Sequence, residues 1–240
     1  MHTRRQLLRH GVLPAVSALA AAFMFGGSAE AATRNVPTRS HAPNPEVRFA
    51  TSMGDFVVEL YPDKAPRTVE NFLRYVHEKH YDGTVFHRVI DNFMVQGGGY
   101  DTRLNEKPTH PPIAHEGRQA YTGGLRNTTG TLAMARTSDP NSAAAQFFIN
   151  VKDNAFLDPV LIPPGDPVPR FEYQGRVYTN VPRASLMHAP QLYGYTVFGR
   201  VIGGMNVINR IKAVPTGAAG PFRSDVPLKP VVIHSAVQIK

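Results

Sequence analysis

The chain has 240 residues, 42% of them hydrophobic and 18% charged, which suffices for a packed core and excludes wholesale disorder. It contains no cysteine, so disulfides, thiol nucleophiles and thiolate metal sites are excluded. The formal net charge is +8, but the basic residues are scattered. We therefore expect a solvated basic surface and no nucleic-acid partner.

Residues 1–31 follow the plan of a secretory signal peptide. Arg4 and Arg5 precede a stretch without charge, and Ala29-Glu30-Ala31 offers small residues at the two positions read during cleavage. The arginine pair resembles a twin-arginine export signal. The alternative is an uncleaved membrane anchor, which the proline, serine and glycine residues of the stretch disfavour. We expect a cleaved, periplasmic or otherwise exported protein without a stable membrane anchor.

Residues 32–45 are polar, contain proline and show no periodicity, which predicts a flexible linker. The remaining residues, 46–240, are expected to form one domain. It opens with a hairpin, in which runs at 47–51 and 56–60 flank a turn with Gly54.

Two helices are predicted. The first follows Pro66, where a first helical turn tolerates proline, and its apolar residues are spaced i, i+3, i+4 and i+7: Val69, Phe72, Leu73 and Val76. The second places Met205, Ile208 and Ile211 on one face.

Short apolar runs predict further strands at 84–90, 93–96, 130–135, 146–151 and 195–201. In the last segment, Val231, Ile233, Ser235, Val237 and Ile239 are expected to point to one side of a half-buried strand. Many short strands with two helices and no alternation of strand and helix indicate a closed antiparallel barrel.

The pattern breaks between Asp158 and Gly194. Prolines and glycines at 163–167 predict turns, and 171–173 and 176–178 are expected to pair around Gln174-Gly175. We interpret 159–193 as a long loop insertion that carries a small hairpin, and loops of this length are usually functional or mobile.

Arg88 stands in the apolar run Phe86–Ile90. A permanently charged side chain is costly there unless it is paired or functional. A buried ion pair or a side chain that reaches solvent at a strand end remains an alternative to a catalytic role. Gln96 on a neighbouring strand is a candidate partner for the guanidinium, and Phe93, Met94 and Phe148 are candidates for an apolar floor beside it.

Six blocks of sequence, in order along nearly all of 47–240, resemble the signature blocks of the cyclophilins. They are Phe86-His87-Arg88, Phe93 to Gly98, Gly130 to Arg136, Gln146 to Asn150, Asn154 to Asp158 and Gly194 to Gly199. Arg136 after Ala135, and Tyr195 in place of the histidine of animal cytosolic members, match the bacterial form.

The resemblance implies a closed eight-stranded antiparallel barrel capped by two α-helices, and peptidyl-prolyl cis-trans isomerase activity that assists folding. It implies that Arg88 is catalytic and that Gln96 positions it. By the same resemblance the substrate is bound by Phe93, Met94, Phe148 and Leu157 around proline and by His87, Ala135, Arg136, Gln146, Phe156 and Tyr195 along the peptide groove.

This chemistry breaks no bond and needs no cofactor and no metal. The expected partners are proline-containing unfolded or nascent exported proteins, and the enzyme is expected to be a monomer. Phe156 replaces the tryptophan whose indole N–H meets cyclosporin in animal members, so we expect cyclosporin to bind weakly at most. A peptide-binding module without catalysis and an unrelated ligand-carrying barrel are the alternatives; Arg88 argues against both.

Three further motifs are weaker. His77 and His80 lack the spacing of a zinc-binding helix. The glycines at 97–99 lack the order of a dinucleotide-binding loop. Asn127-Thr128-Thr129 fits a glycosylation acceptor pattern, which is frequent by chance.

Overall fold

The structure, a computed structural model, describes residues 43–240. The predicted signal peptide and residues 32–42 of the predicted linker lie outside the described residues, so export and cleavage stay predictions. Within the described part, no helix has the length and apolar character needed to span a membrane.

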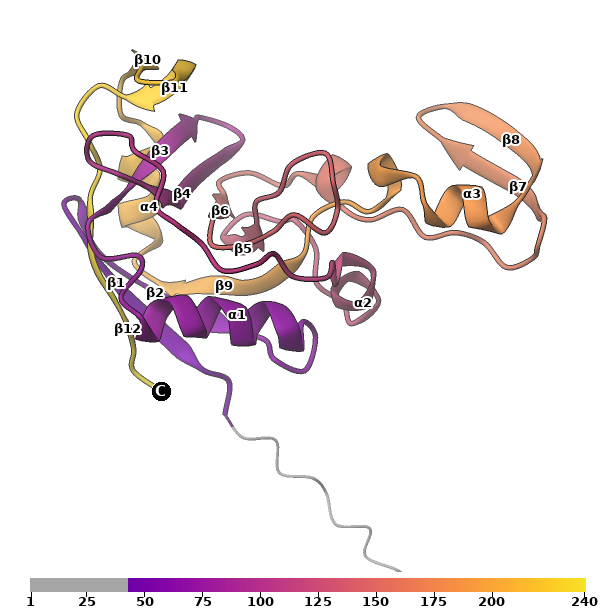
Figure 1. The fold of residues 1–240 in the computed structure, drawn as a ribbon, viewed down its shortest axis with the longest axis horizontal. Coiled ribbons are helices and arrows are strands. Elements are labelled where there is room, and N and C mark those ends of the chain that lie inside the picture. Colours follow the sequence, from indigo (N-terminus) through magenta and orange to yellow (C-terminus); the bar gives the residue numbers. More distant parts are fainter. Residues whose placement is uncertain (1–42) are drawn as a thin grey trace, which may run out of the picture. The chain divides into compact units, whose positions relative to one another are not determined.

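Eight strands form one antiparallel sheet in the order β12-β1-β2-β9-β5-β6-β4-β3 (Figure 1). The two end strands approach each other, because the N–H groups of Gly83 and Phe86 donate to the carbonyls of Ile233 and Val231. The sheet is therefore a nearly closed barrel, as expected. Its strands are β1 (Glu46–Thr51), β2 (Gly54–Leu60), β3 (Thr84–Ile90), β4 (Met94–Asp101), β5 (Thr131–Met134), β6 (Phe147–Asn150), β9 (Val197–Gly203) and β12 (Ile233–Gln238).

The two predicted helices are α1 (Pro66–His77) and α4 (Met205–Lys212). Each buries an apolar stripe against the barrel: Val69, Phe72 and Val76 on α1, and Val207, Ile208 and Ile211 on α4. Two shorter helices, α2 (Gly117–Thr122) and α3 (Arg183–Met187), and the 3-10 turns η1 (Ala155–Leu157) and η2 (Pro190–Leu192) were not expected, because each is too short to show a helical period.

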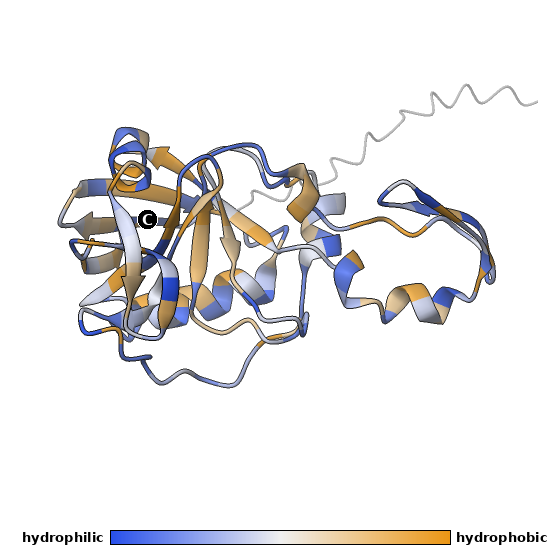
Figure 2. Ribbon diagram, turned by 90° about the horizontal axis from the view of Figure 1, so that it is seen from above, coloured by the Kyte–Doolittle hydropathy of each residue, from blue (hydrophilic) through white to orange (hydrophobic). Residues whose placement is uncertain are grey.

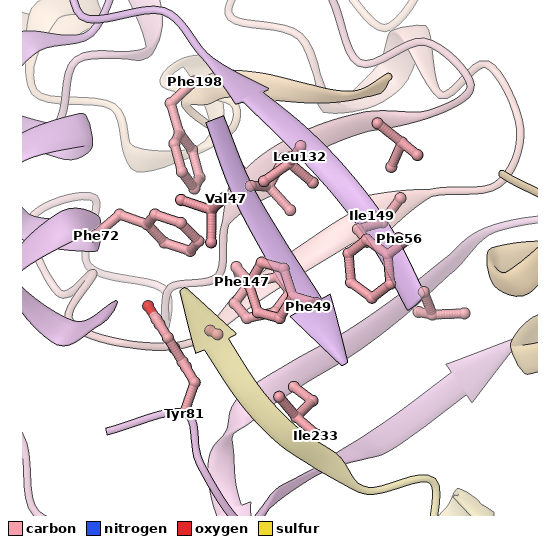
Figure 3. Close-up of a cluster of buried hydrophobic side chains, with 14 of the residues drawn as sticks. Val47, Phe49, Phe56, Phe72, Tyr81, Leu132, Phe147, Ile149, Phe198 and Ile233 are labelled. Carbon is pink, nitrogen blue, oxygen red and sulfur yellow. The ribbon is translucent and has the colours of Figure 1, made fainter. Parts of the chain in front are cut away.

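The barrel interior is filled by aromatic and aliphatic side chains from nearly every strand (Figure 3). Phe49 and Phe56 stack with ring centroids 4.8 Å apart, and Phe72 of α1 packs on Phe198 at 5.0 Å. Hydrophobic colouring is concentrated on the barrel strands (Figure 2). The interior is thus a packed core, and any ligand site must lie on the outside of the barrel.

The predicted facing of the last strand is wrong in its second half. Val231 and Ile233 are buried as expected, but Ala236 is buried next, and Val237 and Ile239 are about half exposed. The pairing of β12 with β1 shifts by one residue between Ala50 and Thr51, which leaves an extra residue in β12. A bulge of this kind reverses the facing of every later side chain.

The segment between Asp158 and Gly194 carries the expected hairpin, formed by β7 (Val168–Tyr173) and β8 (Arg176–Val181) (Figure 1). Its residues have an apolar cluster of their own, built on Val168, Phe171, Leu186 and Leu192. We call residues 160–192 the lobe. A second hairpin, β10 (Thr216–Ala219) with β11 (Phe222–Pro227), was not predicted and packs beside β3.

Candidate active site

The alternation of side chains along β4, β5 and β6 creates an apolar patch on the outside of the barrel. Phe147 and Ile149 point into the core, so Phe148 between them points outward. Ala133 and Met94 face outward in the same way on the neighbouring strands, and with Leu157 and Val197 they form a buried cluster separate from the barrel core.

A cavity of about 80 Å³ lies over this cluster. Phe148 and Tyr195 meet edge to face at 5.5 Å. The floor of the cavity is thus apolar, while Arg88, Gln96 and Arg136 bring polar groups to its lining. Its lining comprises Arg88, Phe93, Met94, Gln96, Ala135, Arg136, Phe148, Leu157 and Tyr195, nine of the twelve predicted site residues.

Arg88 projects from β3 and is exposed, while its neighbours His87 and Val89 are buried. Within residues 43–240 its side chain makes no hydrogen bond and no ion pair. The alternative that Arg88 belongs to a buried ion pair is therefore wrong. All guanidinium N–H groups are available at the rim of the cavity.

Gln96 differs from expectation in its partner. It lies opposite Arg88 in the pairing of β3 with β4. However, its side-chain Nε2 donates to Oε1 of Gln146 at 3.0 Å, and within the described residues it makes no hydrogen bond to Arg88. The expectation that Gln96 orients the guanidinium is thus not met in this structure, although both side chains line the same cavity.

A second cavity, of about 250 Å³, adjoins the first and shares Gln96, Ala135 and Arg136 with it. Gln146, the tenth predicted site residue, lines this second cavity. The two cavities together form a groove in which an extended peptide can place neighbouring side chains. The remaining lining residues are Glu106, Thr109, Thr137, Ser142, Ala144 and Ala145.

Arg136, between the two cavities, is held by the chain that leaves the lobe. Its Nε donates to the carbonyl of Gly194 at 3.0 Å, and its guanidinium lies 4.7 Å over the ring of Tyr195. His115 donates to the same carbonyl through Nε2 at 3.2 Å, since its Nδ1 accepts from the N–H of Gly117. Burial, with a smaller effect of Arg136, lowers the pKa of His115 to about 4, so the ring is neutral at pH 7.

Glycine is required at position 194 itself. Its φ is +63°, and a Cβ there would lie 2.4 Å from the backbone nitrogen of Pro159. The segments that lead into and out of the lobe therefore lie against each other at Gly194, beside the residues of the groove.

His87 lines neither cavity, contrary to the expectation that it borders the groove. Its side chain is buried against the rings of Tyr100 and Phe222, at 4.6 and 5.5 Å, under the β10–β11 hairpin. Burial, reinforced by the charge of Arg88, lowers the pKa of His87 to about 4. No pattern in the sequence predicted the β10–β11 hairpin that covers His87.

Phe156, the last predicted residue, lies at the edge of the groove. Its side chain is 74% exposed, and its ring stacks on Phe93 with centroids 5.6 Å apart. An aromatic surface thus continues from the cavity toward solvent.

Several residues near the groove were missed by the sequence analysis. Glu106, Thr109 and Ser142 lie in loops without a periodic pattern, so no signal marked them as lining residues. The buried Asn127, Asn150 and Asn154 were not recognised as part of the site, although Asn150 and Asn154 fall within blocks that support the family resemblance.

Comparison with known proteins agrees with this geometry. Residues 46–238 match the family model of cyclophilin type peptidyl-prolyl cis-trans isomerases. The chain is 47% identical over 190 residues to peptidyl-prolyl cis-trans isomerase cyp18 of Streptomyces antibioticus, covering 79% of this chain and 96% of that protein. It is 45% identical over 189 residues to peptidyl-prolyl cis-trans isomerase B of Escherichia coli K12, with the same coverage.

Among solved structures, a cyclophilin type isomerase of Cryptosporidium parvum superposes with a TM-score of 0.54 at 22% identity, covering 82% of this chain and 98% of that one. That similarity supports the fold, while the family match and the sequence relatives carry the activity. The chain therefore belongs to the cyclophilin-type peptidyl-prolyl cis-trans isomerases, and it catalyses the rotation of peptide bonds that precede proline.

Proposed function

We propose that this isomerase acts on Xaa-Pro bonds of exported polypeptides, and that Arg88 accelerates the rotation by binding the twisted amide. The observation that carries the mechanism is the position of Arg88, exposed and without a partner in the described residues, at the rim of a cavity with an apolar floor. The observation that supports export is the sequence of residues 1–31.

The chemical problem is a rotation barrier of about 18–20 kcal/mol, which arises from resonance between the amide nitrogen and the carbonyl. When the amide twists, this resonance is lost and the lone pair localises on the proline nitrogen. A guanidinium N–H can then donate to that nitrogen, which accepts no hydrogen bond in either planar state. An interaction made only in the transition state raises kcat.

The other groups of the site hold the substrate. The ring of proline fits the apolar cavity over Phe148, Met94 and Leu157. The backbone N–H of Arg136 makes no hydrogen bond within residues 43–240 and is available to the carbonyl before proline. The second cavity then receives a side chain of the segment on that side of the substrate.

A substitution that keeps the charge but alters its geometry tests the mechanism. Arg88→Lys retains a cation at the rim, but an ammonium group is a compact donor that lacks the planar fork. We expect kcat/KM on a short Xaa-Pro peptide to fall about tenfold or more, equivalent to at least about 1.4 kcal/mol. Exchange spectroscopy of the peptide by NMR measures both rotation rates directly, and an unchanged rate would show that charge alone suffices.

A further inference from the structure

Three buried asparagine side chains form a directed chain of hydrogen bonds that is tied to two lining residues of the first cavity, Phe93 and Leu157. Asn154 Nδ2 donates to Oδ1 of Asn150 at 2.8 Å, Asn150 Nδ2 donates to Oδ1 of Asn127 at 3.2 Å, and Asn127 Nδ2 donates to Oδ1 of Asp158 at 2.8 Å. None of the three asparagines is more than 2% exposed. Every amide therefore donates in the same direction, and the carboxylate that ends the chain strengthens it.

Both ends of this chain reach the walls of the cavity. Asn154 Nδ2 also donates to the carbonyl of Phe93 at 2.9 Å, an acceptor shared with the N–H of Val151. The carbonyl of Asn154 accepts from the N–H of Leu157 at 2.8 Å, and Asp158 is the next residue. Asn154 thus ties together the two segments that supply Phe93 and Leu157.

Neither of these two wall residues belongs to a strand of the barrel. Phe93 lies in the turn between β3 and β4, and Leu157 ends the single turn η1. The hydrogen bonds of the sheet therefore do not fix their separation directly. The asparagine chain supplies that restraint, and its three asparagines are buried and line neither cavity.

We infer that Asn154 is a positioning residue of the isomerase, which holds Phe93 and Leu157 at the spacing that the proline ring fills. The inference rests on the proposed assignment of the first cavity as the proline site. The cavity contacts the ring in the planar and the twisted states alike, so loosening it weakens both. Loss of Asn154 is therefore expected to raise KM and to leave kcat nearly unchanged.

The same network gives a structural role to Asn127, the first residue of the Asn127-Thr128-Thr129 pattern. The amide of Asn127 is 1% exposed and is occupied by Asp158, so the folded protein cannot accept a glycan there.

Asn154→Asp tests the inference with almost no change of shape. The ionised carboxylate has no N–H or O–H to donate and places an oxygen against the oxygens of Phe93 and Asn150, whereas the protonated acid donates one hydrogen bond. Burial raises the pKa of the introduced carboxyl group. We therefore expect the group to ionise between about pH 5.5 and pH 8.5, the range over which KM is measured. The ratio of the variant KM to the wild-type KM should rise from about twofold at pH 5.5 to about tenfold at pH 8.5, while the kcat ratio stays near one.

The ratio at each pH cancels titrations that both proteins share. The charged groups around the network are Asp158 at its end, Asp153, which accepts from Thr129, and Arg88 across the cavity, and all three are present in both proteins. A residue that contributed only to stability would not make KM depend on pH in this way.

Thr84→Val is the matched control. Thr84 is fully buried, donates to the carbonyl of Tyr81, lines neither cavity and lies at the first position of β3, four residues before Arg88. This variant should unfold at lower urea concentration with unchanged KM. Should Asn154→Asp not fold, Asp158→Asn removes only the terminal charge and should raise KM about two- to threefold.

A folded Asn154→Asp variant with wild-type KM across this pH range would overturn the inference. So would a fall in kcat at constant KM or, if that variant does not fold, a wild-type KM in Asp158→Asn. Arg88→Ala is measured in parallel: wild-type kcat in that variant would refute the proposed mechanism, whatever Asn154→Asp shows.

Discussion

Gln96 lies opposite Arg88 on adjacent strands, yet its side-chain amide donates to Gln146 at 3.0 Å and not to the guanidinium. The free enzyme thus holds Gln96 between the two cavities and leaves the donors of Arg88 unoccupied. Because the Arg88 guanidinium has no protein partner before the substrate binds, it exchanges only hydrogen bonds to water when it donates to the twisted amide. This arrangement suits an interaction made in the transition state.

The position of His87 predicts a stability effect without a catalytic effect. The pKa of His87 is lowered to about 4, from 6.5, mainly by burial, so the unfolded chain binds a proton between about pH 6.5 and 4 that the folded protein does not. The folded protein therefore loses stability relative to the unfolded chain as the pH falls through this window. His87→Phe should unfold like the wild type at pH 7.5 and be about 1–2 kcal/mol more stable relative to it at pH 5.

Urea unfolding at both pH values measures this difference. Because His87 lines neither cavity, kcat/KM of His87→Phe should equal the wild-type value. A large loss of activity in a well-folded variant would mean that His87 does contact substrate.

The N-terminal sequence predicts cleavage after Ala31. Protein isolated from its native host should begin at Ala32 and be found outside the cytoplasm, because Ala29-Glu30-Ala31 matches the small-residue pattern of a cleavage site. Intact-mass measurement of the isolated protein reads the N-terminus directly. Full-length protein retained in the membrane fraction would favour the uncleaved anchor instead.

Phe156 predicts weak inhibition by cyclosporin. The phenyl ring stacks on Phe93 at the edge of the groove but offers no N–H donor, and an acceptor left unpaired on binding costs about 1–3 kcal/mol. Phe156→Trp should therefore bind the drug about tenfold more tightly than the wild type. The inhibition constant of cyclosporin is measured for both proteins with the same peptide substrate. Equal constants would show that the missing N–H donor does not weaken binding.

The lobe should be removable. It has its own apolar cluster, and its ends meet where the N–H of Val160 donates to the carbonyl of Leu192 at 3.0 Å. Replacing Leu161–Gln191 with a short linker keeps this bond and the residues of the groove, and loop closure depends only weakly on length. The shortened protein should unfold in one cooperative step and retain activity on short peptides within about threefold.

Circular dichroism during urea unfolding, together with peptide kinetics, tests this. A broad or multi-step transition in the shortened protein would show that the lobe supports the barrel. A change confined to protein substrates would indicate that the lobe contacts them.

Much of the barrel follows from periodicity in the sequence, because strands with one buried face must alternate. The same alternation explains why Phe148 faces outward while its neighbours fill the core. Prediction of side-chain facing from alternation fails where the backbone leaves regular strand geometry. The bulge in β12 reverses the facing of Val237 and Ile239. No local residue pattern signals such an extra residue.

Features that depend on distant partners were also missed. The hairpin that covers His87 lies more than 120 residues away along the chain, and Asn154 donates to the carbonyl of Phe93 across 61 residues of sequence. Such pairings are set by tertiary packing, to which local patterns do not respond. The bonding of Gln96 to Gln146 is of the same kind, since either side chain has several acceptors within reach.

The most direct test of the account is the effect of Arg88→Ala on turnover and on peptide affinity, measured on one preparation. If Arg88 binds the proline nitrogen only as the amide twists, kcat/KM should fall by about 10²–10³, or roughly 3–4 kcal/mol. The apolar cavity over Phe148 remains, so the dissociation constant of a non-isomerising peptide analogue should rise only modestly. A folded Arg88→Ala variant that turns over peptide at nearly the wild-type rate would contradict the account.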